Sequence, residues 1–97
     1  MSKLDFIPEV FQAVAGDNFT VYAYMNDGSI RLYDVKPAIK KGGVFKILED
    51  EKFFREKLTV LNNSVAWDLS GTRDESRCID IDPFSIFDSP TVTDIPE

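Results

Sequence analysis

Residues 18–35 read NFTVYAYMNDGSIRLYDV, and this stretch decides the fold. Apolar and polar side chains alternate on either side of Asp27-Gly28, as they do in the two strands of a β-hairpin. Both of these positions accept the positive φ that a type I′ turn requires, so the sequence predicts a two-residue loop. In the register that this loop sets, Tyr24 pairs with Arg31.

The predicted register sorts the side chains of the hairpin into two faces. The apolar face is expected to contact the core and consists of Phe19, Val21, Ala23, Met25, Ile30 and Leu32. The opposite face carries Tyr22, Tyr24, Arg31 and Tyr33. Tyrosine and arginine are enriched in protein interfaces, but aromatic cross-strand pairs also stabilise a sheet. This second face is therefore a candidate partner-binding surface or homodimer interface, with a purely structural role as the alternative.

Shorter patterns predict the remaining elements. We expect further strands over residues 9–15, 57–61, 64–69 and 77–81, and helical turns that begin at Pro37, near Phe45 and at Pro83. Asp50 is a predicted N-cap for a short helix over residues 51–56, and Asp82 for the turn at Pro83.

Together these elements predict an α+β fold. An antiparallel sheet of about five to six strands, formed by a meander and a second hairpin, would carry two or three short helices. Residues 1–87 are expected to form a single compact domain. Residues 88–97 contain two prolines, are acidic and show no periodic pattern, which predicts a mobile or extended C-terminal tail.

The second hairpin is expected to turn at Asn62-Asn63, because asparagine tolerates left-handed backbone geometry. In that register Leu58 opposes Trp67, and this matched position favours core packing of the indole over a role as a binding anchor. The single cysteine, Cys78, cannot form an internal disulfide and fits a small buried apolar position better than a reactive thiol.

The composition argues against catalysis. The chain has 97 residues, a net charge of −6 and no histidine. It therefore lacks the residue that most often shuttles protons and binds metals at neutral pH, and it contains no glycine-rich phosphate loop. We expect no enzymatic activity and no cofactor. Because no apolar signal core or membrane-length segment is present, we expect a cytoplasmic protein without a membrane partner.

Asp80 and Asp82 are the candidate metal ligands. They lie two residues apart at a predicted strand end, which puts both carboxylates on one side, with Asp68 nearby. Paired carboxylates can bind Mg²⁺ or Ca²⁺. We favour the structural alternative, in which Asp82 caps the turn at Pro83 and Asp80 accepts hydrogen bonds.

Charge is distributed unevenly along the chain. Residues 36–57 contain seven basic and four acidic side chains, whereas residues 80–97 contain five acidic and no basic ones. The acidic end suits a basic partner. The negative net charge disfavours nucleic-acid binding, which depends on Lys and Arg contacts to phosphates. A DNA-binding protein would need a basic face, for which the candidates are Lys36, Lys40, Lys41 and Lys46.

The order of several motifs carries a family resemblance. A tyrosine-rich strand leads through Asn26-Asp27-Gly28 to an Ile-Arg-Leu-Tyr-Asp strand, and then come a Gly-Gly-Val-Phe-x-x-Leu segment, a hairpin with Trp67 and a closing Asp-Ile-Asp-Pro. Over residues 9–87 this order resembles the small bacterial family catalogued as domain of unknown function 2442. The polar insert at residues 70–76 departs from that pattern.

The resemblance implies a compact α+β domain without assigned catalytic residues. Some members are suspected antitoxins of toxin–antitoxin pairs, and others are fused to a helix-turn-helix. We therefore predict a protein-interaction domain, the antitoxin-like partner of a small basic toxin. The alternatives are a small-molecule or metal-binding domain and a DNA-binding regulator.

Overall fold

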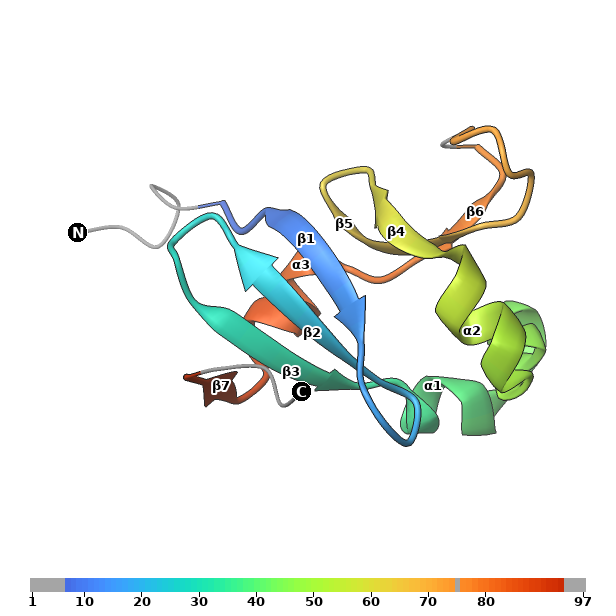
Figure 1. The fold of residues 1–97 in the computed structure, drawn as a ribbon, viewed down its shortest axis with the longest axis horizontal. Helices are drawn as coiled ribbons and strands as arrows, with labels where there is room; N and C mark the ends of the chain where they lie inside the picture. Colours follow the sequence, from blue (N-terminus) through green and yellow to red (C-terminus); the bar gives the residue numbers. More distant parts are fainter. Residues whose placement is uncertain (1–6, 75, 94–97) are drawn as a thin grey trace.

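The computed structural model describes residues 7–74 and 76–93 (Figure 1). In this part of the chain, seven strands form two antiparallel sheets. One sheet has the order β1 (Val10–Ala15), β2 (Thr20–Met25), β3 (Ile30–Asp34) and β7 (Thr91–Val92). The other has the order β4 (Leu58–Leu61), β5 (Ser64–Asp68) and β6 (Cys78–Asp80). The predicted α+β class is confirmed, but the strands divide between two sheets instead of forming one.

Four short helices complete the described fold: α1 (Lys36–Lys41), the 3₁₀ helix η2 (Gly43–Glu49), α2 (Glu51–Lys57) and α3 (Pro83–Phe87). Two of them begin at the predicted caps. The Asp50 carboxylate accepts a hydrogen bond from the Lys52 amide at 3.0 Å, and the Asp82 carboxylate accepts one from the Phe84 amide at 2.9 Å. None of the described helices is long and apolar enough to cross a lipid bilayer.

One hydrophobic core joins the inner sides of both sheets. Trp67 and Phe54 are its largest fully buried side chains, with ring centroids 5.4 Å apart. The Trp67 indole N–H donates to the Phe54 carbonyl at 3.0 Å, so its polar atom is satisfied. The edge of Phe19 meets Phe54 at 5.3 Å. The prediction that Trp67 packs in the core is confirmed.

The β4–β5 hairpin has the predicted register. Leu58 pairs with Trp67, and the strands meet at Asn62-Asn63. Both asparagines adopt positive φ, at 55° and 61°. These are the left-handed conformations of a two-residue hairpin loop.

The β2–β3 hairpin differs from the prediction by one residue. Ala23, not Tyr24, lies opposite Arg31. The loop has three residues, 26–28, and the Met25 amide donates to the carbonyl of Ser29 at 2.9 Å.

Asn26 explains this difference. Its amide donates to the Glu9 carbonyl at 2.9 Å, and its side chain accepts from the Glu9 amide and donates to the Ile7 carbonyl. Asn26 is therefore bound to the segment before β1 and is not available for the predicted pairing with Ser29. Gly28, at φ 89°, then supplies the left-handed residue that closes a three-residue loop.

The shift exchanges the two faces of β3. Arg31 and Tyr33 share the core side with Ala23, whereas Ile30 and Leu32 share the outer side with the tyrosines of β2. Both predicted faces are therefore wrong for β3, because side chains alternate with a period of two.

Part of the C-terminal tail, for which a mobile or an extended conformation was expected, is extended. Thr91 pairs with Arg31 and Val92 with Ile30, and the Leu32 amide donates to the Pro90 carbonyl at 2.9 Å. These residues form an additional strand on the edge of β3. Residues 94–97 lie outside the described part of the chain.

Candidate functional site

The outer face of the four-stranded sheet is the candidate partner-binding surface. We use "outer face" for six half-buried residues that the strand pairings place on one side: Val14, Tyr22, Tyr24, Ile30, Leu32 and Val92. Gln12 and Thr20 lie on the same side. Among the residues of these four strands, the only charge on this side is that of Asp34, at the end of β3.

Helix α3 packs against the other side of this sheet and lies behind it in Figure 1. Its Ile86 is fully buried in the core, and its Phe87 ring lies 4.2 Å from the Arg31 guanidinium. Among the described residues, the core cluster and the side chains packed against it include none of the six residues of the outer face. This apolar and aromatic surface is therefore separate from the core.

Close packing fixes one of its aromatic rings. A Cβ atom placed on Gly16 would come within 2.8 Å of the Tyr22 ring. The absence of a side chain at Gly16 thus allows the ring of Tyr22 to lie over the β1–β2 turn. Preordered rings lose little side-chain entropy on binding, which favours their use as interface contacts.

The four residues predicted to bind a partner do not share a face. Tyr22 and Tyr24 lie on the outer face, but Arg31 and Tyr33 point to the core side. Arg31 donates to the Ser89 carbonyl at 3.0 Å. Burial raises the pKa of the Tyr33 hydroxyl, and the charge of Asp34 raises it further. The side chains of Arg31 and Tyr33 therefore contact the C-terminal segment and the core. Their predicted places on the outer face are occupied by Ile30 and Leu32.

The candidate metal ligands are engaged in structural hydrogen bonds. Asp82 caps α3, and Asp80 accepts from the Asn62 side-chain amide at 3.1 Å. Both line a groove that also contains Lys41, whose positive charge opposes cation binding. Within the described residues, no three His, Cys, Asp or Glu side chains are grouped to hold a metal ion.

Asp68 does not join this pair, because its carboxylate folds the loop that follows β5. It accepts hydrogen bonds from the amides of Ser70, Gly71 and Arg73, at 3.2, 3.0 and 2.7 Å. Burial of the carboxyl group opposes ionisation, but these bonds and one from the Ser70 hydroxyl hold the pKa of Asp68 below its usual value. The loop in turn covers β4, where Arg73 donates to the Val60 carbonyl at 2.8 Å.

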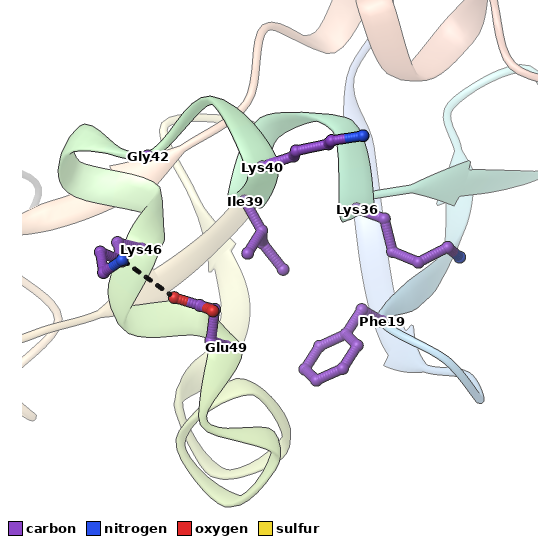
Figure 2. A pocket seen from close by; sticks show the side chains of 7 residues that line it. All are labelled: Phe19, Lys36, Ile39, Lys40, Gly42, Lys46 and Glu49. Atoms are coloured by element: carbon purple, nitrogen blue, oxygen red, sulfur yellow. Dashed lines mark ion pairs between the residues drawn. The ribbon is translucent and has the colours of Figure 1, made fainter.

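A second candidate site is a groove of about 540 Å³, which we call the lysine groove. Its lining residues are Phe19, Lys36, Ile39, Lys40, Gly42, Lys46 and Glu49 (Figure 2). Three of the four lysines considered for a basic face meet here, whereas Lys41 lines the groove of Asp80 and Asp82. The sequence did not identify Phe19 and Ile39 as part of this site, because their proximity depends on tertiary packing.

Cys78 is half-buried and lies in β6 opposite Asp68. The Asn62 side-chain amide lies 3.7 Å from its sulfur. Cys78 is therefore less buried than the sequence predicted.

Comparison with protein-family models, with curated proteins and with solved structures finds no match to this chain.

Proposed function

We propose that the protein is a cytoplasmic, non-enzymatic interaction domain that binds another protein through the outer face of its four-stranded sheet. One observation carries the proposal: an apolar and aromatic sheet face lies on the side opposite α3 and outside the core. Contiguous apolar patches of a few hundred Å² on a soluble domain are often functional. Tyrosine contributes large contact area at low entropic cost, which suits Tyr22 and Tyr24 to this role.

The size of the face sets the strength of such an interaction. Three strands about 4.8 Å apart and about five residues long, together with the two residues of β7, cover roughly 270 Å². A standard interface buries about 800 Å² on each partner. A partner must therefore also contact neighbouring surface, such as Phe11, which is 67% exposed on the edge strand β1, or it binds weakly.

Within this class, we propose an antitoxin-like partner of a small basic toxin, as the resemblance to domain of unknown function 2442 implies. The net charge of −6 would speed encounter with a basic protein. The negative charge also disfavours pairing of two copies, which makes a homodimer the less favoured use of the same face.

The test is co-expression with the product of the neighbouring open reading frame, followed by calorimetry on the purified pair. The double variant Tyr24→Thr/Leu32→Thr keeps β-forming residues but removes the aromatic and aliphatic contacts. We expect it to weaken binding at least about tenfold, as for loss of interface hot spots.

Phe84→Ser is the matched control, since Phe84 is 55% exposed but lies on α3, on the other side of the sheet. It should leave the affinity unchanged. Equal binding by the double variant and the native chain, with both folded, would exclude the outer face as the contact surface.

A further inference from the structure

The lysine groove combines positive charge with an apolar surface. Residues 36–48 contain four lysines and no acidic residue, in a chain whose net charge is −6. Three of these lysines line the groove, and Glu49 is its single acidic lining residue. The side chains that line the groove therefore carry a formal charge of +2, and the Asp34 carboxylate lies beside them, paired with Lys36.

Two of these three lysines already have partners within the protein. Lys46 pairs with Glu49 at 3.7 Å, but both side chains are more than half exposed, so the pair contributes little. Lys36 pairs with Asp34 and donates to the Asn18 carbonyl. The side chain of Lys40 makes no hydrogen bond or ion pair with another described residue.

The apolar part of the groove comes from two half-buried side chains. Figure 2 shows Ile39 directed into the space between Phe19 and Glu49. The Phe19 ring is held by its edge contact with Phe54, and its backbone is fixed at φ 61°. Ile39 is held by α1, which ends at Gly42 with φ 86° so that η2 can fold back beside it.

We propose that the lysine groove binds a small phosphate monoester with an aromatic or aliphatic group. The dianionic phosphate would be held by Lys40, with Lys36 and Lys46 redirected from their exposed ion pairs. The apolar group would lie on Phe19 and Ile39. The groove volume of about 540 Å³ is within the range of small-molecule sites. This site is distinct from the outer face, so either proposal can fail without the other.

The test uses phenyl phosphate as the probe and monitors its binding by ¹H–¹⁵N NMR of the full chain. Shifts should localise to the amides around Ile39, Gly42 and Lys46, with a dissociation constant of about 1–5 mM for a ligand of this size. Inorganic phosphate, phenol and benzoate should each bind more weakly, because each lacks either the apolar group or the second negative charge.

Lys40→Gln should raise the dissociation constant about three- to fivefold, the effect of one solvent-exposed charge pair. Lys52→Gln is the matched control, because Lys52 is an exposed lysine on α2 outside the groove. It should leave the constant unchanged.

The proposal is overturned if phenyl phosphate shifts no resonances of the groove, or if the two lysine variants weaken binding equally. Benzoate binding as tightly as phenyl phosphate would overturn the assignment to a dianion. A DNA oligonucleotide that shifts the same resonances at lower concentration would overturn the assignment to a small molecule and favour nucleic-acid binding.

Discussion

The two hairpins of this chain both turn at residues that tolerate left-handed geometry, but their strand registers are set in different ways. The β4–β5 hairpin closes at Asn62-Asn63 in the register that turn chemistry alone predicts. The β2–β3 hairpin contains the stronger local signal, Asp27-Gly28, yet its loop also includes Asn26, and its register shifts by one residue. The difference is Asn26, which is bound to residues 7–9, just before the neighbouring strand β1. A turn sets its own register only where no tertiary contact competes for its flanking residues.

The largest expected change in stability is at Trp67, the core residue of the second hairpin. Trp67→Ala should lower the free energy of unfolding by about 3–5 kcal/mol, since it leaves a large cavity beside Phe54. Chemical denaturation would measure this loss. Tyr24→Ala, on the outer face of the first hairpin, is the comparison variant and should cost less than half as much. Equal losses would contradict the separation of the outer face from the core.

Asn26→Ala tests the cause of the register shift. The variant removes the side-chain hydrogen bonds to the Glu9 amide and the Ile7 carbonyl. We expect a loss of about 1–2 kcal/mol in the free energy of unfolding. Cross-strand NOEs between β2 and β3 would show whether the pairing moves toward the two-residue loop. Unchanged stability and unchanged pairing would mean that Asn26 does not set the register.

The two loops also differ in the residue that adopts left-handed geometry. The first loop has a glycine there, Gly28, whereas the second has asparagines. The φ of Gly28 is 89°, and a Cβ atom added there would meet nothing within 4 Å. Gly28→Ala should therefore cost about 1 kcal/mol, the penalty for an L-residue in left-handed geometry. In the second loop Asn63→Gly relieves the same strain and should raise stability by a few tenths of a kcal/mol. Thermal unfolding of both variants measures the contrast, and a destabilised Asn63→Gly chain would contradict it.

The smallest expected effect is one of pH. Hydrogen bonds from the Ser29 hydroxyl and amide lower the pKa of Asp27 in the first loop, and the loop amides after β5 lower that of Asp68 despite its burial. A carboxylate with a lowered folded pKa stabilises the fold fully above its unfolded pKa of about 3.9 and loses this contribution as the pH falls through the folded value.

Stability should therefore decline as the pH falls below about 4, the unfolded pKa of these carboxyl groups. Asp68→Asn should flatten that decline more than Asp27→Asn, because more hydrogen bonds select the ionised form of Asp68. Urea unfolding across this range measures both slopes. A decline of the same slope in Asp68→Asn and the native chain would assign the acid sensitivity to other carboxylates.

Local signals predicted much of the fold. Asp50 and Asp82 were identified as helix caps, and Asn62-Asn63 as a turn, because each depends on residues within three positions in the sequence. The division into two sheets and the strand at residues 91–92 were missed. Both depend on contacts between segments that are distant in the sequence. In addition, a two-residue strand is too short to show a periodic pattern.

The candidate sites show the same limit. Tyr22 and Tyr24 were placed correctly on one face, because alternation within β2 needs no partner strand. Arg31 and Tyr33 were placed on the wrong side, because their side depends on the register that Asn26 shifts. The lysines of the groove were visible as an acid-free stretch, whereas Phe19 joins them across a tertiary contact.

The short strand β7 affects how this chain can be shortened. Thr91 and Val92 occupy the edge of β3 that would otherwise present unpaired amide and carbonyl groups. Open strand edges recruit other chains and seed aggregation. A truncation at residue 87 would thus expose the unpaired edge of β3. Self-association of such a fragment through this edge would then distort any measurement of its affinity for a partner. Point substitutions that leave β7 in place avoid this confusion.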